Sequence, residues 1–209
     1  EGWVPIGKSS IRFTGTYDGG GYLIYGLTVN RPDKDFQALF GMIAGSEIKN
    51  LNVSCNVTGN TFTAGLVGYS IISKIEKCSV EGEINGIYRS GGLVGFSNES
   101  DISLCYSNVN IIGDSWIGGF AGSLYKSDVS DCYALGDVEA NIYVGGFTGQ
   151  NDSASIKNVY STCSVTGNMV YGGLIGTSNI TVQNSFWDTE TSGQLLSEGG
   201  TGLTSAEMK

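Results

Sequence analysis

Carboxylates are the only side chains of this sequence that could carry out acid–base catalysis. Histidine is absent, which removes Ser-His-Asp and Cys-His nucleophilic catalysis and histidine-based zinc sites. Glycoside cleavage needs two carboxylates about 5 to 10 Å apart, and Asp101 and Asp128, with Asp131 nearby, are the candidates. Positions equivalent to the first two in the internal repeat described below hold Glu47, Lys74 and Ser155. Such a mixture is typical of a solvated loop, and the basic residues that a uronate-binding cleft needs are sparse. We therefore predict no catalytic site.

The cysteines could in principle form disulfides or hold a metal ion. There are five of them, at Cys55, Cys78, Cys105, Cys132 and Cys163. Stacking of the middle three would place them about 4.8 Å apart, within the Cα range of a disulfide. Their side chains would point in parallel, however, five is an odd number, and no Cys-x-x-Cys pair exists. We predict buried free thiols that act as small hydrophobic side chains, with no cofactor and no metal.

Aromatic residues recur at one predicted outward position. Tyr106, Tyr133, Tyr160 and Phe186 follow Asn52 and Ser79 at equivalent positions. A ladder of this kind could bind sugar rings or another protein. The alternative, which we favour, is that the rings stabilise a sheet by stacking or are covered by a terminal segment.

Five Asn-x-Ser/Thr sequons could accept glycans. They lie at Asn52, Asn56, Asn98, Asn151 and Asn179. The first two are predicted to project outward from a strand, and the other three to lie in the loop after a glycine-rich strand. Such sites are accessible if the host glycosylates, although a surface rich in Asn and Ser also produces sequons by chance.

An internal repeat positions all of these side chains. Six segments that contain an apolar residue and end in glycine start at positions 38, 65, 92, 119, 146 and 173, which differ by 27 at every step. We call this step the repeat length, and a set of residues related by it a column. One apolar column holds Ile48, Ile75, Ile102, Val129 and Ile156, and another holds Leu51, Cys78, Cys105, Cys132 and Val159. From the second column onward, apolar and polar residues alternate with a period of two, which indicates a strand with one buried face.

A repeat this short cannot bury its own apolar face, so neighbouring repeats must stack. We predict an all-β fold, a parallel β-helix (β-solenoid), right-handed, with one repeat per coil and about seven coils with irregular caps. Repeated glycine pairs and the period-two alternation argue against an α-solenoid. Glycine columns such as Gly59, Gly86, Gly113 and Gly167 are expected at corners that need a positive φ.

The whole chain, residues 1–209, is expected to form a single solenoid domain. Residues 1–12 would form an N-terminal cap, residues 13–37 a short first coil, residues 38–191 the regular repeats, and residues 192–209 a C-terminal cap or the start of a further segment. In the first coil, Ile24, Leu27 and Val29 match Ile48, Leu51 and Val53 with a spacing of 24. Thr204-x-x-Glu207 reads as a capping box, so we expect the chain to be part of something longer.

Composition excludes two classes of partner. The chain has 33 glycines, 2 prolines and a net charge of −9. No Lys/Arg cluster is present to track phosphates, so nucleic acid is not an expected partner. No stretch approaches the ~20 apolar residues that span a bilayer, so we expect no membrane insertion by this segment.

Three motifs resemble the GLUG repeat of bacterial and archaeal surface proteins. These are Gly91-Gly92-Leu93-Val94-Gly95 with Ile102-x-x-Cys105-Tyr106-Ser107, the opening Phe13-x-Gly15-Thr16-Tyr17-Asp18-Gly19, and the closing stretch from Phe186 to Gly193. The resemblance implies a secreted or cell-surface location, in adhesin-like proteins or beside the catalytic domains of immunoglobulin A peptidases. It implies no reaction for the repeats themselves.

These observations favour a non-catalytic structural or interaction module of a secreted or cell-surface protein. It would be a rigid stalk, an adhesin repeat region or a filament subunit, with another protein or a surface glycan as partner and with end-to-end self-association. The alternative is a carbohydrate-binding or carbohydrate-cleaving β-helix that uses the aromatic ladder and surface carboxylates. Ice binding ranks last, because the outward columns are mixed rather than regular rows of threonine.

Overall fold

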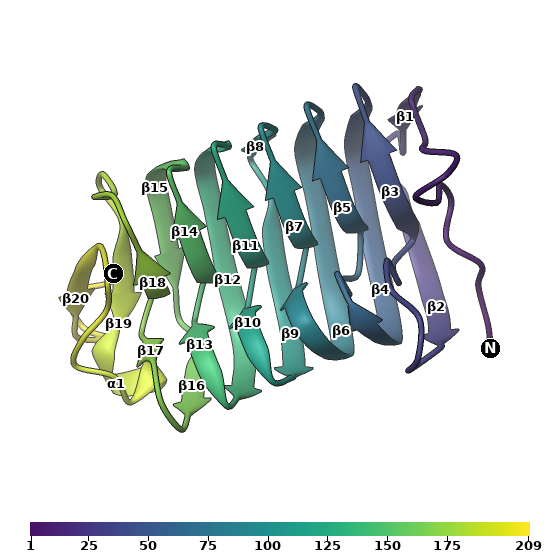
Figure 1. Ribbon diagram of the computed structural model, residues 1–209. Helices are drawn as coiled ribbons and strands as arrows, with labels where there is room; N and C mark the ends of the chain where they lie inside the picture. The colour runs from purple at the N-terminus through teal and green to yellow at the C-terminus, as the bar shows by residue number, and fades with distance from the viewer.

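The computed structural model describes residues 1–209 as a parallel β-helix of about six turns. Figure 1 shows the turns stacked along one axis, with the N-terminus at one end and the C-terminus at the other. The predicted all-β solenoid is therefore confirmed, with about six turns where about seven coils were predicted. The strands fall into one sheet of 14 strands and one of six.

The larger sheet covers two sides of the solenoid, because its long strands bend from one side to the next. Its strands are β1 (Thr16–Asp18), β2 (Leu23–Asn30), β4 (Glu47–Thr61), β6 (Lys74–Gly91), β8 (Asp101–Ser103), β9 (Tyr106–Ile112), β10 (Ser115–Gly118), β12 (Asp128–Ala140), β13 (Ile142–Gly145), β15 (Ser155–Ser161), β16 (Ser164–Gly167), β17 (Tyr171–Gly172), β19 (Phe186–Asp188) and β20 (Thr201–Leu203).

The smaller sheet forms the remaining side and lies in front in Figure 1. Its strands are β3 (Phe40–Ala44), β5 (Val67–Ile71), β7 (Val94–Asn98), β11 (Ala121–Tyr125), β14 (Thr148–Asp152) and β18 (Ile175–Ser178). The helix α1 (Thr189–Ser192) follows β19, with the Asp188 side chain as its N-cap. No helix is long and apolar enough to cross a bilayer.

Equivalent residues of successive repeats are paired in parallel throughout the regular region. Ile48 pairs with Ile75, and Ile75 with Ile102, in the larger sheet. The same repeat length separates the paired residues of β3 and β5 and of every later pair of neighbours in the smaller sheet. The repeat length read from the sequence is thus the length of one turn.

The first coil departs from its predicted register. Val29 pairs with Val57 and Leu27 with Cys55, and Ile24 pairs with Val53 after a register shift. The predicted match of Val29 to Val53 was therefore wrong by four positions. A shift of four keeps the same side chains facing inward, because the side-chain period of a strand is two. This coil adds strands only to the larger sheet, while Ile6 and Phe13 make single bridges to β3.

Each regular turn bends at three positions with left-handed backbone, and non-glycine residues occupy most of them. Fifteen non-glycine residues have a positive φ. Thirteen of them fall into three columns spaced by the repeat length: Asn50, Lys77, Leu104, Asp131 and Asn158, then Phe62, Arg89, Trp116 and Tyr143, and then Ile72, Glu99, Lys126 and Ser153; the other two, Phe36 and Asn184, extend the second and first columns at a spacing of 26. Because this conformation strains residues that carry a Cβ, the surrounding ladders must hold each corner in place.

The predicted glycine corners were wrong. Gly59, Gly86, Gly113 and Gly167 have no positive φ. They are needed for close packing, since a Cβ on Gly86 would lie 2.2 Å from the Ser90 hydroxyl oxygen. Positive φ is instead found at Gly82 (φ 135°), where a Cβ would also lie 1.9 Å from the carbonyl oxygen of Cys55.

The interior is one continuous core of 41 buried residues that runs the length of the solenoid. Its members stack on their own column, as Phe120 does on Phe147 with ring centroids 4.5 Å apart and an interplanar angle of 9°. The apolar faces predicted from the period-two alternation lie in this core.

A buried column of serines forms hydrogen bonds from turn to turn at one bend. The N–H groups of Ser46, Ser73 and Ser100 donate to the hydroxyl oxygens of Ser73, Ser100 and Ser127 at 3.1, 3.1 and 3.2 Å. The column ends at Ala154, whose N–H donates to Asn151 Oδ1 at 3.0 Å. Ser73, Ser100 and Ser127 thus each satisfy a backbone donor that would otherwise be orphaned inside the protein.

We predict that Ser100→Ala lowers the free energy of unfolding by about 1–3 kcal/mol, because it removes a buried acceptor. The N–H of Ser73 and the hydroxyl of Ser70, which donates at 2.6 Å, would both lose their partner. Urea unfolding followed by circular dichroism measures the change. Ser103→Ala, at a half-buried serine of β8, is the control, and equal midpoints for the two variants would contradict the role of the column.

Candidate functional site: the stacked side-chain columns

The predicted tyrosine ladder is present on the larger sheet. Tyr106 of β9, Tyr133 of β12 and Tyr160 of β15 occupy paired positions. The ring centroids of the first pair are 4.9 Å apart with an interplanar angle of 1°, and those of the second pair are 5.0 Å apart with an angle of 5°. The three rings are therefore stacked face to face along the solenoid axis.

Phe186 has the predicted backbone register but does not extend the stack. It pairs with Tyr160 through β15 and β19, yet the stacked ring pairs of the ladder end at Tyr160. Both side chains line a hollow of about 470 Å³ together with Leu203 and Met208. The C-terminal segment thus lies against the end of the ladder.

Face-to-face stacking limits what the ladder can bind. Both faces of the Tyr133 ring are occupied by its two neighbours, so only its edges can face solvent, and Tyr133 also covers one face of Tyr106 and one face of Tyr160. A sugar that stacks on an aromatic side chain needs a free ring face. Burial, and then the nearby hydroxyls of Tyr160 and Tyr106, raise the pKa of the Tyr133 phenol. The geometry supports a stabilising role for the ladder.

A second aromatic column lies at a corner and was missed in the sequence analysis. It runs from Phe36 and Phe62 through Arg89 to Trp116 and Tyr143, with Trp116 and Tyr143 stacked at 5.3 Å and 12°. The Arg89 guanidinium lies 5.2 Å from the ring centroids of both Phe96 and Trp116. From Phe62 onward the members of this column are spaced by the repeat length, so the signal was visible in the sequence.

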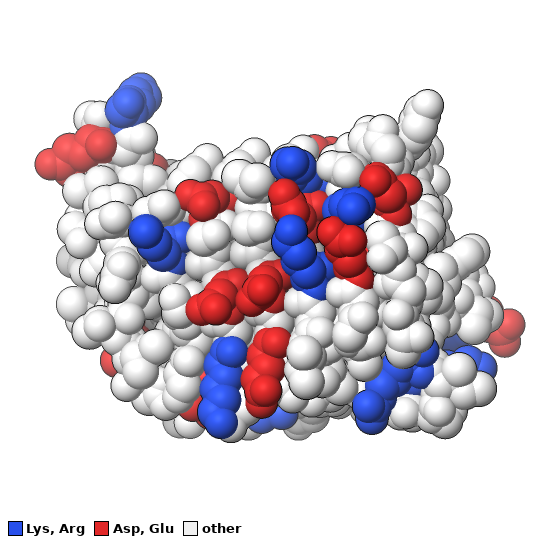
Figure 2. Space-filling view, turned by 90° about the horizontal axis from the view of Figure 1, so that it is seen from above, with Lys and Arg blue, Asp and Glu red and all other residues white.

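The carboxylate candidates for glycoside chemistry lie on an open surface. Asp101 and Asp128 are paired on adjacent turns, and both are exposed. Asp131 is also exposed, and its carboxylate accepts a hydrogen bond from the Asn158 amide at 3.0 Å. Figure 2 shows acidic and basic groups interleaved over one face. No group of three or more His, Cys, Asp or Glu side chains is placed to hold a metal ion.

All five cysteines are buried free thiols, as predicted. Cys78, Cys105 and Cys132 form one row, in which the Cys78 N–H donates to Cys105 Sγ at 3.4 Å. Burial raises the pKa of the Cys55 and Cys163 thiols to about 12. The pKa of Cys105 is also raised, chiefly by burial. Cys55, Cys105 and Cys163 are therefore not poised as nucleophiles at neutral pH.

The five sequons differ in accessibility. Asn56 and Asn179 are exposed, while Asn52 and Asn98 are half-buried. Asn98 is the last residue of β7, and Asn151 lies in β14 and is 1% exposed, so the placement of these two in an accessible loop was wrong. The Oδ1 of Asn151 caps the end of the serine column, and the folded protein leaves no room for a glycan there.

Comparison with known proteins confirms the resemblance drawn from the motifs. The family model described as "The GLUG motif" matches residues 140–166. A segment of 54 residues is 41% identical to a protein of Evansella cellulosilytica named, by inference, a Gly-rich membrane protein. That segment is 25% of this chain and spans 6% of that relative.

A solved structure shares the fold. It is the crystal structure of a protein from Bacteroides ovatus described, by inference, as an immunoglobulin A1 protease. The similarity covers 91% of this chain and 69% of the other, with a TM-score of 0.76 and 20% identity. At this identity the likeness concerns the β-helix alone.

We predict that no thiol reacts with Ellman's reagent at pH 8 in the folded protein, whereas all five react in denaturant. Because folding raises the pKa of the Cys55 and Cys163 thiols from 9.0 to about 12, the stability gained by keeping these two thiols protonated is present below pH 9 and is lost as the pH rises toward 12. Thr166→Cys, at an exposed position, is the positive control. Rapid labelling of unmodified folded protein would contradict the buried row.

We predict that Tyr133→Ala costs more stability than Tyr106→Ala, by about 0.5–1.5 kcal/mol, because Tyr133 stacks on two rings and Tyr106 on one. Tyr133→Phe keeps both stacks and should change little. Thermal and urea unfolding of the three variants provide the test. If the two alanine variants were equally stable, the Tyr133–Tyr160 stack would contribute nothing to stability.

Proposed function

We propose that this chain, a β-helix with a GLUG motif, is a rigid spacer and interaction module of a secreted or cell-surface protein. In this role the solenoid holds other parts of the protein at a fixed distance. It also presents a long, patterned side surface to partners.

The observation that carries the proposal is the unbroken register from β3 to β18. Six strands follow one another in the smaller sheet, and paired residues are always one repeat length apart. The core of 41 residues is continuous beneath them. Bending such a body requires the simultaneous loss of backbone hydrogen bonds and buried contacts, so it acts as a stiff rod rather than as a chain of hinged units.

The surface location is supported by the named similarities. One relative is named as a membrane protein, and the structural neighbour is described as a protease that would act on an immunoglobulin. Because the matched segment is a small part of that relative, we place any membrane anchor or catalytic activity in other parts of the full protein. Within this chain the lack of histidine and the solvated setting of Asp101 and Asp128 argue against catalysis.

A second candidate role, as a filament subunit, is favoured by the apolar side chains at both ends. Tyr22 and Tyr25 are 80% and 84% exposed beside or on the terminal strand β2. Leu195 and Leu196 are 83% and 80% exposed near the C-terminal end. Contact between the two different ends would be head-to-tail and would generate open fibres.

The rod is tested by placing spin labels at Asn30→Cys and Asn168→Cys, in opposite end turns of the solenoid. We expect one narrow interlabel distance, because the intervening turns form one body. A broad distribution would rule out a rigid spacer. Electron microscopy of the same protein separates the two roles: monodisperse particles at high concentration would contradict the filament, and fibres would support it.

A further inference from the structure

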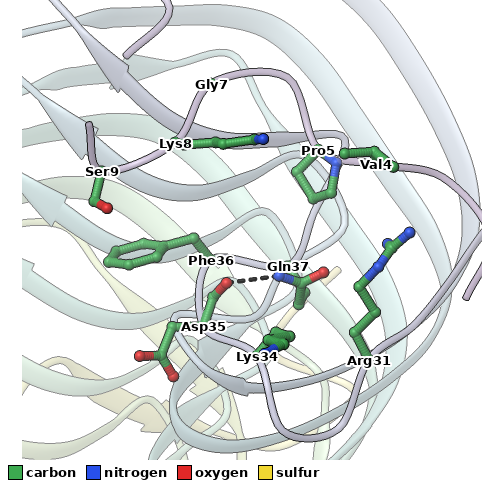
Figure 3. A pocket seen from close by; sticks show the side chains of 10 residues that line it. All are labelled: Val4, Pro5, Gly7, Lys8, Ser9, Arg31, Lys34, Asp35, Phe36 and Gln37. Atoms are coloured by element: carbon green, nitrogen blue, oxygen red, sulfur yellow. Dashed lines mark hydrogen bonds between the residues drawn. The ribbon is translucent and has the colours of Figure 1, made fainter. Parts of the chain in front are cut away.

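A cleft of about 370 Å³ lies at the N-terminal end of the solenoid. Figure 3 shows residues 4–9 on one side of it and residues 31–37, which join β2 to β3, on the other. Gly41 lets these segments come together, because a Cβ there would lie 2.6 Å from the Gly7 carbonyl oxygen and 3.1 Å from Pro5.

The cleft gathers positive charge on a chain whose net charge is −9. Lys8, Arg31 and Lys34 line it against a single acid, Asp35. The Asp35 carboxylate accepts a hydrogen bond from the Thr61 N–H at 3.1 Å, and the ion pairs of the protein involve neither Lys8 nor Lys34. Both ammonium groups are therefore free to bind an anion. Arg31 donates to the carbonyls of Trp3 and Gly2 and so positions the N-terminal wall.

An aromatic ring borders the same cleft. Phe36 is the first member of the corner column and stacks on Phe62 of the next turn at 5.1 Å and 21°. The other ring that lies near Phe36 is Tyr69, on the same side of Phe36 as Phe62. The column therefore ends at Phe36, so a ring face can meet the cleft here, unlike the enclosed faces of Tyr133.

A buried amide supplies an unused acceptor. Gln37 lines the cleft and is 6% exposed. Its Nε2 donates to the Asp35 carbonyl at 2.6 Å, which fixes the amide, while its Oε1 is buried without a hydrogen-bond partner. A buried acceptor of this kind is costly unless a donor reaches it; the Oε1 is enclosed in the free protein, so a ligand hydroxyl in the cleft would reach it once the neighbouring side chains shift.

We infer that this cleft binds a carboxylate-bearing sugar, a uronic acid unit of an acidic polysaccharide. The carboxylate would lie between the ammonium groups of Lys8 and Lys34, the apolar face of the sugar ring on Phe36, and a sugar hydroxyl would donate to Gln37 Oε1. Inorganic phosphate or sulfate would satisfy only the first of these contacts. This inference goes beyond the proposed spacer role and gives one end of the rod a ligand.

The test is calorimetric titration of the whole chain with trigalacturonate, with neutral galactotriose and with inorganic phosphate. We expect binding of trigalacturonate alone, weakened by added salt. Lys8→Gln and Lys34→Gln should each raise the dissociation constant about tenfold, equivalent to about 1.4 kcal/mol, and Phe36→Leu should weaken it as well. Lys157→Gln removes one exposed positive charge far along the solenoid and should leave binding unchanged.

Unfolding midpoints of the variants show whether each is folded. Because the two lysines are exposed, we expect the Lys8 and Lys34 variants to fold normally. Absence of trigalacturonate binding, equal binding of galactotriose, or equal binding of phosphate would each overturn the inference. Equal weakening by Lys157→Gln would also overturn it, because the attraction would then be general charge. None of these outcomes bears on the rigidity of the rod, which the spin-label distances test separately.

Discussion

Parallel hydrogen bonding between residues one repeat length apart places each side chain directly over its equivalent in the next turn. A side chain therefore packs mainly against the equivalent residues of the turns above and below it. In the serine column, from Ser46 to Ser127, the N–H of one serine donates to the hydroxyl of the serine in the next turn. The cysteine row and the stacked tyrosines obey the same constraint. Stability, surface pattern and stiffness all follow from it.

The same constraint shapes the corners and the surface charge. Left-handed backbone costs about 1–2 kcal/mol for a residue with a Cβ, and the ladders on both sides of each bend compensate for it. Like charges stacked directly opposite are unfavourable, and Glu47, Lys74 and Asp101 alternate in sign up one column. Asp101 and Asp128 break this alternation only where both are exposed to solvent.

Specific binding is expected where the columns end rather than along them. Within a column, ring faces are covered by neighbouring rings, as for Tyr133, and polar groups form hydrogen bonds with their equivalents. At the N-terminal end the corner column stops at Phe36, and the irregular first coil leaves the Gln37 acceptor unmatched. A solenoid with a uniform middle and chemically distinct ends is suited to act as both a spacer and a point of attachment.

The sequence alone determined whatever recurs: the turn length, the inward side chains, the cysteine row and the tyrosine ladder are all repeated at a visible spacing. The tertiary structure decided what occurs once, and also at which residues of the repeat each turn bends. The register of the first coil differs by four positions from the predicted one, and Val29 still faces inward. The left-handed corner backbone occurs at residues such as Leu104 and not at Gly86. The cleft depends on Lys8 and Lys34 lining the same hollow, which no periodicity encodes, because Lys8 belongs to an unrepeated segment at the end of the solenoid.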